Sequence, residues 1–283
     1  MPRPLGQHFL HDPAVLDRIV DALDPQPHDR VLEIGPGGGT LTRRLASRVG
    51  VVVAIEKDRG LFLELRAASS GKREMGDVFP DNVTVVQGDA LTADWHALIA
   101  QPPAVSPSPH PASRIPHPAY KVAGNIPYYI TSPLIDKALT PPRPTVVVFL
   151  VQKEVADRVT SAPGSKIYGA LSVGVQVIAR AERLFTVKAG TFNPPPAVDA
   201  AVLRLRPRDA PLIDDAEQAA FRSFVTALFG QRRRQLVRGL RTVAGVGREE
   251  AARLLETLGI DLAARPEVLS PSAFVSLYRA LCR

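Results

Sequence analysis

Four consecutive residues, Asn125-Ile126-Pro127-Tyr128, combine a carboxamide, a proline and an aromatic ring directly after an apolar, strand-like segment. These residue types suit a buried strand poorly, because proline removes a donor from the sheet and Asn needs hydrogen-bond partners of its own. They suit the mouth of a binding site, where a carboxamide and a ring face a ligand. Such a site needs further ligand-binding residues, and the segments upstream of Asn125 offer candidates.

A glycine-rich segment, Val31–Thr42 (VLEIGPGGGTLT), lies between a predicted strand and a predicted helix. Its glycines, which begin at Gly35, allow the backbone to approach a ligand closely, and the start of the helix offers free N–H groups. Such a turn alone is weak evidence, because many matches are only tight turns. Glu33 narrows the choice of ligand. A carboxylate on the rim of the binding site would repel a pyrophosphate but would tolerate a sulfonium and an α-amino group.

Two carboxylates end the next predicted strands. Glu56 closes VVVAIE, 21 residues after Gly35, where a ribose-binding carboxylate is expected. Asp89 in VVQGDA is placed to accept a hydrogen bond from an adenine amino group. Each carboxylate could instead cap a helix. With Glu33 and the glycines, however, they lie at successive strand ends, where open α/β sheets bind ligands. We interpret the set as a site for S-adenosylmethionine.

The tetrad Asn125–Tyr128 resembles the [Asn/Asp]-Pro-Pro-[Tyr/Phe]-like motif of amino-methyltransferases that act on adenine N6 or related nitrogens. An amine conjugated to a purine is a poor nucleophile, because its lone pair is delocalised into the ring. Hydrogen bonds from the amine to the Asn125 side-chain oxygen and to a backbone carbonyl, assigned to Ile126, would free that lone pair for in-line attack on a methyl carbon. Pro127 would fix the backbone and Tyr128 would stack on the base. Positioning and electrostatics would then suffice without a strong base; the alternative is a plain turn with a core tyrosine.

The elements that must position these residues follow from the alternation of short apolar segments with helix-like segments between residues 30 and 205. The predicted strands are Arg30–Ile34, Val51–Glu56, Val83–Gln87, Tyr120–Ala123 and Thr145–Val151. This alternation predicts a mostly parallel, doubly wound sheet. Further on we predict helices over Gln152–Val159 and Tyr168–Ala179, and strands over Leu184–Lys188 and Ala200–Arg206. That strand pair is compatible with an antiparallel edge element.

The last part of the chain is helical in pattern. The predicted helices are Ala216–Leu228, Arg232–Arg241, Arg248–Leu258 and Ser272–Leu281. We therefore expect a first domain over residues 1–207 and a small helical domain over 208–283. The segment Pro102–Pro118 holds seven prolines and is expected to be a surface insertion of the first domain.

Composition narrows the class of protein. The 283 residues contain one cysteine, Cys282, which excludes an internal disulfide and a cysteine-based zinc site, and we expect no metal. No apolar segment has the length of a signal peptide or a membrane span, so we expect a cytoplasmic protein without a membrane partner.

The net charge is +7, and residues 204–283 carry 14 arginines against 9 acidic residues. This concentration of basic charge favours a polyanionic partner, although a solvated basic face is the alternative.

Several motifs taken together identify a family. The chain resembles the bacterial 16S rRNA adenine-N6,N6 dimethyltransferases, the KsgA/RsmA family, over nearly its whole length. The motifs in family order are GQHFL, GNIPYYITSPLI, QKEVADRV, YGALSV, FNPPPAVDAAVLRL and FRSFVTALFGQRRRQL. The resemblance implies a Rossmann-like class I methyltransferase fold with a seven-stranded, mostly parallel sheet, an antiparallel edge element and a C-terminal all-helical domain. It also implies that residues 1–12 form a lid over the cofactor.

Site residues carry over from the resemblance position by position. It implies a cofactor site for S-adenosylmethionine, and for its product S-adenosylhomocysteine, formed by His8, Leu10, Gly35, Glu56, Asp89 and Asn125. It implies a catalytic role for Asn125, Ile126, Pro127 and Tyr128. Phe192 is a candidate second wall of the base pocket, with simple packing as an equal alternative. Arg232, Arg233 and Arg234 are candidate RNA-binding residues.

The implied substrate is a pair of adjacent adenines in the 3′-terminal hairpin of 16S rRNA, each receiving two methyl groups. The implied partner is the assembling small ribosomal subunit, recognised through shape, phosphates and splayed bases, and we expect a monomer. His8 departs from the family, in which many members have Asn. The segment Arg3-Pro4-Leu5 is less basic than expected, and Pro102–Pro118 lengthens the connection from Asp89 to Asn125.

Three other functions share part of this sequence pattern. A methyltransferase of the macrolide-resistance type, acting on an adenine of 23S rRNA, would share the cofactor site and the tetrad, but YGALSV and FGQRRRQL favour the small-subunit enzyme. A non-catalytic assembly or RNA-binding factor on the same fold conflicts with the intact Glu56, Asp89 and tetrad. In a nicotinamide-dependent oxidoreductase, the tetrad Asn125–Tyr128 would have no function.

Overall fold

The computed structural model describes residues 8–69, 79–100 and 119–282, and these form two compact units. The first unit contains Met1–Ala156 and Glu182–Arg206, and the second contains Asp157–Ala181 and Pro207–Arg283. Residues 1–7 of the predicted lid 1–12 and the segment 102–118 lie outside the described residues. Residues 157–181, which the sequence analysis placed in the first domain, group with the C-terminal helices instead, because they pack against those helices.

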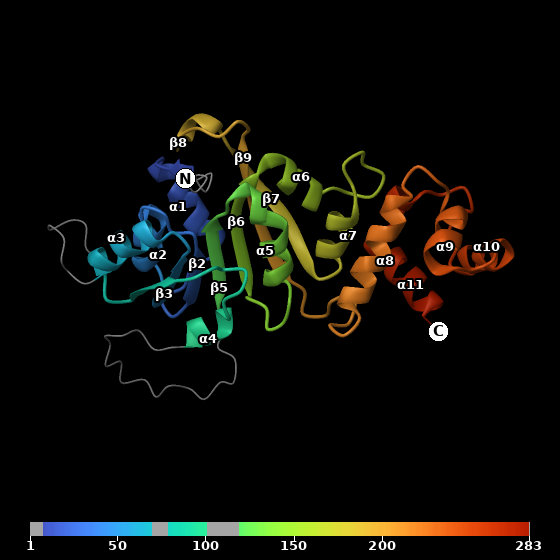
Figure 1. The fold of residues 1–283 in the computed structure, drawn as a ribbon, viewed down its shortest axis with the longest axis horizontal. Helices are drawn as coiled ribbons and strands as arrows, with labels where there is room; N and C mark the ends of the chain where they lie inside the picture. The colour runs from blue at the N-terminus through green and yellow to red at the C-terminus, as the bar shows by residue number, and fades with distance from the viewer. Residues whose placement is uncertain (1–7, 70–78, 101–118, 283) are drawn as a thin grey trace. The chain divides into compact units, whose positions relative to one another are not determined.

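A seven-stranded sheet forms the centre of the first unit (Figure 1). Its strands, in the spatial order β4-β3-β2-β5-β6-β9-β7, are Val83–Gln87, Val51–Glu56, Arg30–Ile34, Lys121–Asn125, Val146–Gln152, Ala200–Pro207 and Ala179–Val187. Strands β2 to β6 are parallel, and β9 runs antiparallel to β6. The predicted fold class, with its antiparallel element near one edge, is confirmed.

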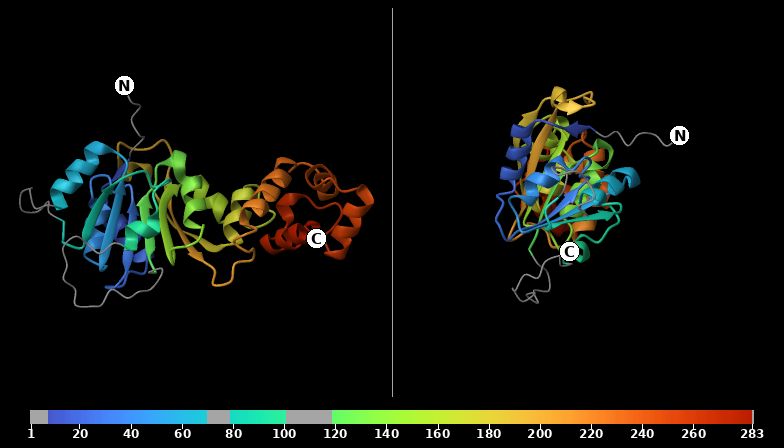
Figure 2. Two further views of the ribbon diagram at one scale, coloured as in Figure 1. Left: turned by 60° about the horizontal axis from the view of Figure 1, so that its bottom comes forward. Right: turned by 90° about the vertical axis from the view of Figure 1, so that its left-hand side faces the viewer.

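The helices of this unit are α1 (Pro13–Ala22), α2 (Thr40–Ala46), α3 (Arg59–Ser69), α4 (Trp95–Ala100), η1 (Tyr128–Ile130), α5 (Thr131–Ala138), α6 (Lys153–Val159) and η2 (Ala189–Thr191). Helix α6 begins in this unit and ends in the second unit. The strand order runs one way from β2 to β4 and the other way from β5 to β6. Right-handed crossovers therefore place α2 and α3 on one face of the sheet and α5 on the other. Figure 2 shows the sheet and helices from two further sides.

Both faces of the sheet are buried, which explains the continuous apolar strands. On one face, Val31 and Val148 join a core with residues from α1, α2 and α3. Their neighbours Leu32 and Phe149 point to the other face and are fully buried as well. Glu33, Glu56 and Asn125 lie at or next to the carboxyl ends of their strands, which places these residues on one edge of the sheet.

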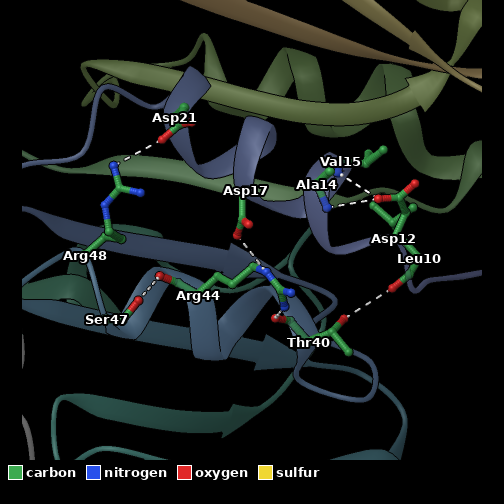
Figure 3. Close-up of polar contacts among 10 residues, drawn as sticks. All are labelled: Leu10, Asp12, Ala14, Val15, Asp17, Asp21, Thr40, Arg44, Ser47 and Arg48. Atoms are coloured by element: carbon green, nitrogen blue, oxygen red, sulfur yellow. Dashed lines mark hydrogen bonds and ion pairs between the residues drawn. The ribbon is translucent and has the colours of Figure 1, made fainter.

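Ion pairs hold α1 beside α2, the helix that follows the glycine-rich turn (Figure 3). Arg44 of α2 contacts Asp17 of α1 at 2.8 Å, and Arg48, two residues after the end of α2, contacts Asp21 of α1 at 3.1 Å. Asp12 caps α1 by accepting hydrogen bonds from the N–H groups that follow it. Such exposed ion pairs contribute little individually; they join the middle and the end of α1 to α2 and to the residue pair after it.

A second, two-stranded antiparallel sheet joins β1 (Phe9–Leu10) to β8 (Phe192–Asn193). Leu10 pairs with Phe192, and the N–H of His11 donates to the Thr191 carbonyl. This pairing binds the start of the described chain to the segment after β7.

The second unit is a helical bundle of α7 (Ala170–Gln176), α8 (Gln218–Gly230), α9 (Leu236–Ala244), α10 (Arg248–Thr257), η3 (Pro266–Val268) and α11 (Pro271–Leu281). Its core contains the buried aromatic residues Tyr168, Phe221, Phe274 and Tyr278, and the half-buried Phe229 contacts the rings of Tyr168 and Phe274. No helix among the described ranges is long and apolar enough to cross a membrane.

The strand predicted over Leu184–Lys188 is longer and begins at Ala179, and two of the predicted helices differ clearly from the observed limits. The helix predicted over Tyr168–Ala179 ends at Gln176, and β7 begins at Ala179. The side chain of Gln176, the last residue of this helix, donates to the carbonyls of Val159 and Ser161. The helix predicted from Arg232 begins at Leu236, because residues 231–234 form turns.

Candidate active site

One pocket lies at the carboxyl ends of the parallel strands in the first unit. It collects all ten predicted residues of the cofactor and base sites, namely His8, Leu10, Gly35, Glu56, Asp89, Asn125, Ile126, Pro127, Tyr128 and Phe192. Each parallel strand from β2 to β5 contributes the residues at its end, as expected for an open α/β sheet. The fold therefore brings together residues that are up to 184 positions apart, from His8 to Phe192.

Gly35 and Gly37 of the glycine-rich turn line this pocket, and the position of Gly37 requires glycine. Gly37 has a φ of 56°, and a Cβ atom there would lie 2.8 Å from the Phe9 ring. The N–H of Gly37 donates to Glu56 Oε2 at 3.2 Å, and the N–H of Asp58 donates to Glu56 Oε1 at 2.8 Å. Glu56 thus links the end of β3 to the turn after β2, and burial raises the pKa of its carboxyl.

Glu33 does not lie on the rim, so that part of the sequence analysis was wrong. Its side chain lines the pocket but is buried in the protein, and the residue is 1% exposed. Burial raises the pKa of Glu33 to about 8, and its Oε2 atom has no hydrogen-bond partner among the described residues. A buried acid with an unpartnered oxygen beside a pocket is a suitable partner for a cationic ligand.

Asp89 is paired with Lys57, a residue that the sequence analysis missed. Lys57 Nζ lies 2.9 Å from Asp89 Oδ2, and the N–H of Leu91 donates to Asp89 Oδ1 at 2.9 Å. The hydrogen bond from Lys57 lowers the pKa of Asp89, which stays ionised and able to accept a further hydrogen bond. Lys57 directly follows Glu56 at the same edge of the sheet. This position in the sequence could have identified Lys57 as a residue near the site.

Lys137 of α5 was also missed, and it holds the loop that carries Asp89. Its Nζ donates to the carbonyls of Leu91 and Ala93 at 2.8 and 2.6 Å, and it lies 5.4 Å from the centre of the Trp95 ring. Helix α5 begins just after the tetrad. Lys137 therefore connects the helix behind the tetrad to the loop at the opposite wall of the pocket.

We expect the substitution Lys137→Met to weaken binding of S-adenosylmethionine about tenfold, with a smaller effect on kcat. Two carbonyls would lose a charged donor, and the loop with Asp89 would lose its fixed position. Isothermal titration with the cofactor checks this. Lys166→Met, which removes an exposed ammonium group in the second unit, is the matched control. A dissociation constant within twofold of wild type for Lys137→Met would contradict the assigned role.

Asn125 ends β5 and is oriented by the start of the chain. Its Nδ2 donates to the His8 carbonyl at 2.7 Å, and its Oδ1 accepts no hydrogen bond from the residues that the structure describes. The Pro127 carbonyl accepts from the N–H of Ile130 at 3.1 Å, whereas no donor in the described part of the chain bonds the Ile126 carbonyl. The tetrad thus presents two unoccupied acceptors, one from a side chain and one from the backbone.

Aromatic and apolar side chains form the walls around these acceptors. The ring of Tyr128 lies 6.1 Å from that of His8, centre to centre, and His8 Nδ1 donates to the Pro194 carbonyl at 2.8 Å. Phe192 is 5% exposed, lines the pocket and also belongs to the hydrophobic core. Tyr129, which we did not predict, lines the pocket and is 61% exposed.

The predicted RNA-binding arginines lie in the second unit, where they differ in their contacts. Arg232 donates to the Lys166 carbonyl at 2.7 Å and lies 3.7 Å from Glu267. Arg233 and Arg234 are exposed. A structural role is thus visible for Arg232 alone.

The donor set fits S-adenosylmethionine. Buried and partly buried carboxylates suit a ligand with a sulfonium, an amine and ribose hydroxyls, and no cluster of metal-binding side chains occurs in the described ranges. The doubly wound sheet, the glycine-rich turn and the strand-end carboxylates define a Rossmann-like methyltransferase.

Comparison with known proteins identifies the family. The family described as "Ribosomal RNA adenine dimethylase" matches residues 2–281. The ribosomal RNA small subunit methyltransferase A of Nostoc is 41% identical over 99% of this chain and 98% of its own length. A dimethyladenosine transferase from Plasmodium falciparum has the same fold, with a TM-score of 0.78, 24% identity and coverage of 96% and 97% of the two chains. The 23S rRNA methyltransferase ErmE superposes with a TM-score of 0.70 and 28% identity over 97% of this chain and 100% of its own.

The chain belongs to the ribosomal RNA adenine dimethylase family. The resemblance described from its motifs is confirmed.

Proposed function

We propose that this protein transfers methyl groups from S-adenosylmethionine to N6 of two adjacent adenines in the 3′-terminal hairpin of small-subunit rRNA. The product would be N6,N6-dimethyladenosine, formed in the cytoplasm on assembling small subunits by a monomeric enzyme. The observation that supports this best is the orientation of Asn125, whose Nδ2 is held by the His8 carbonyl at the mouth of the pocket. The names of the full-length relatives support the choice of the small subunit.

In this proposal, the cofactor lies among the strand-end residues. Asp89 accepts a hydrogen bond from its adenine, Glu56 accepts from its ribose, and Glu33 offers a buried carboxylate to its positive charge. Gly35, His8 and Leu10 line the same pocket. When bound, S-adenosylmethionine supplies an electrophilic methyl carbon.

The chain's own residues then prepare the target amine. Asn125 Oδ1 and the Ile126 carbonyl accept hydrogen bonds from its two N–H groups. These bonds localise the lone pair on the nitrogen and direct it towards the methyl carbon. Pro127, with φ −55° and ψ 132°, fixes the backbone between the carbonyl and the aromatic ring. Tyr128 stacks on the extruded base, and Phe192 forms the second wall. The proton that the methylated nitrogen loses passes to water, so no strong base is required.

RNA is held outside this pocket by basic residues of the second unit, and Arg233 and Arg234 are exposed candidates. Phosphate contacts of this kind position RNA without reading its sequence. The choice of adenine would therefore rest on the pocket, and overall affinity on the basic surface.

A transfer assay with both ribosomal subunits tests the proposal. Unmethylated small subunits and, in parallel, large subunits are incubated with labelled S-adenosylmethionine. We expect label in the small subunit only. Label confined to the large subunit would assign the chain to the activity that the name of ErmE describes, and it would overturn the proposal.

A further inference from the structure

One carboxylate at the edge of the sheet that carries the pocket has no part in the arrangement described above. Asp199 directly precedes β9, the strand that runs antiparallel to β6, and Ala200 of β9 pairs with Gln152 at the carboxyl end of β6. An antiparallel strand begins at the edge where its parallel neighbours end. Asp199 therefore lies at the same edge of the sheet as Glu56 and Asn125, although it begins a strand instead of ending one.

Both side-chain oxygens of Asp199 accept hydrogen bonds from the turn after β7. Oδ1 accepts from the N–H of Ala189 at 3.1 Å, and Oδ2 accepts from Lys188 Nζ at 2.9 Å. The backbone carbonyl of Asp199 accepts from the N–H of Lys153, the first residue of α6, at 3.0 Å. Asp199 thus joins three segments of the first unit, namely the end of β6, the start of β9 and the turn η2.

The turn that Asp199 holds leads directly to Phe192. Inside the turn, the Lys188 carbonyl accepts hydrogen bonds from the N–H and the hydroxyl of Thr191 at 3.0 and 2.7 Å. Phe192 is the next residue, and it pairs with Leu10 in the two-stranded sheet. The position of the Phe192 ring in the pocket therefore depends on the turn on one side and on this pairing on the other.

Asp199 also acts on the other aromatic wall of the base pocket. Burial raises the pKa of the Tyr128 hydroxyl, and the negative charge of Asp199 raises it further. The hydrogen bonds from Lys188 and Ala189 lower the pKa of Asp199 itself, so that its carboxylate is ionised at neutral pH. Asp199 is thus linked to Phe192 through the turn and to Tyr128 through its charge.

The two side-chain contacts of Asp199 differ in their expected contributions. The Lys188 side chain is 78% exposed, and ion pairs of this kind contribute little. The N–H of Ala189 belongs to a partly buried turn, and such a donor is costly to leave without a partner. The contact between Asp199 and Ala189 is therefore the one that holds the turn.

We infer that Asp199 is a positioning residue for the base pocket, because its hydrogen bond to Ala189 fixes the turn that places Phe192 as the second wall. The inference rests on the proposed function for the identity of the group that enters the pocket, an extruded adenine. It assigns the effect to the acceptor Oδ1 and not to the charge of the carboxylate. A displaced wall would leave the target amine poorly aligned, and misplacement by about 1 Å can cost a factor of about 100 in rate.

The first test compares D199A with D199N in methyl transfer to unmethylated small subunits. We expect D199A to lower kcat about 30-fold through misalignment, with KM for subunits and the dissociation constant of S-adenosylmethionine changed less than threefold. D199N keeps an acceptor for Ala189 and should retain kcat within threefold of wild type. The matched control D81A removes an exposed carboxylate of the first unit that does not line the pocket, and it should have no effect. Equal losses in D199A and D199N, or near-normal kcat in D199A, would overturn the inference.

A double-mutant cycle with F192L separates positioning from a general loss of stability. Leucine keeps most of the apolar contacts of Phe192 with the core but removes its flat ring. If Asp199 acts through that ring, D199A should lower kcat less than threefold in the F192L background. A full 30-fold loss in that background would show that Asp199 acts elsewhere. Titration with S-adenosylmethionine should give one bound cofactor per chain for every variant, which shows that the variants are folded.

Hydrogen exchange of the cofactor-free protein tests the inference without methyl transfer. The amides of Ala189 and Thr191 should exchange at least tenfold faster in D199A than in wild type, and at the wild-type rate in D199N. Exchange in β3 should be the same in all three proteins. If wild type transfers no methyl group but the turn loosens only in D199A, the role of Asp199 stands and the proposed function falls. If wild type is active but exchange in the turn is unchanged in D199A, the inference falls and the proposed function stands.

Discussion

Asn125→Ala is expected to reduce kcat for methyl transfer by a factor of about 1,000 while small-subunit binding stays near the wild-type level. The substitution removes the side-chain acceptor for the target amine, and losing one preorganised hydrogen-bonding group of this kind costs a factor of 100 to 1,000. It also frees the His8 carbonyl, which Nδ2 contacts at 2.7 Å. Single-turnover kinetics with saturating cofactor and subunits would measure the chemical step.

Asn125→Asp separates the two functions of this carboxamide. The carboxylate keeps an acceptor for the amine but cannot donate to the His8 carbonyl, and the two oxygens would repel each other. We expect intermediate activity, with weaker cofactor binding because β1 would be held less firmly. Near-normal turnover by Asn125→Ala would show that amine activation does not depend on this side chain.

Glu33→Gln is expected to stabilise the cofactor-free protein and to weaken cofactor binding. Burial raises the pKa of Glu33 to about 8, from about 4.5 in the unfolded chain. The folded form therefore binds the proton more tightly, and wild-type stability decreases as pH rises from about 4.5 to about 8. A neutral amide is spared this loss, which at pH 7 amounts to at most about 3 kcal/mol. Thermal denaturation of both proteins at pH 5 and pH 7 checks the prediction, and the difference in Tm should be larger at pH 7.

Cofactor binding should show the opposite preference. A cationic ligand binds the ionised carboxylate, so wild-type affinity for S-adenosylmethionine should increase as pH rises towards 8. The Glu33→Gln variant should bind more weakly and lack this component of the pH dependence. Equal affinities and parallel pH profiles would mean that Glu33 does not face the ligand's charge.

Much of the first unit was predictable because its strands are short, apolar and buried on both faces. The predicted strands Arg30–Ile34, Val51–Glu56 and Val83–Gln87 match β2, β3 and β4 at both ends. The carboxylates could be placed because parallel strands end at one edge, so that sequence position fixes spatial position. Phe192 is also in the pocket, but the pairing of Leu10 with Phe192 that brings it there is not visible in any local pattern.

The errors arose where distant contacts decide local structure. The segment 231–234 has helical propensity, yet Arg232 is drawn to the Lys166 carbonyl and the N–H of Leu236 donates to the Ala264 carbonyl, so the helix starts later. The burial of the Glu33 side chain depends on the helices that pack over β2. The sequence of the strand alone does not show how these helices pack. Lys137 contacts carbonyls 44 and 46 positions away, and no spacing rule connects them.

The most direct test of the central claim is nucleoside analysis of small-subunit rRNA after reaction of unmethylated subunits with this protein and S-adenosylmethionine. The account predicts N6,N6-dimethyladenosine at two adjacent positions of the 3′-terminal hairpin, with wild type, and its absence with Asn125→Ala. Methylation at another atom, or at adenines elsewhere in the rRNA, would contradict it.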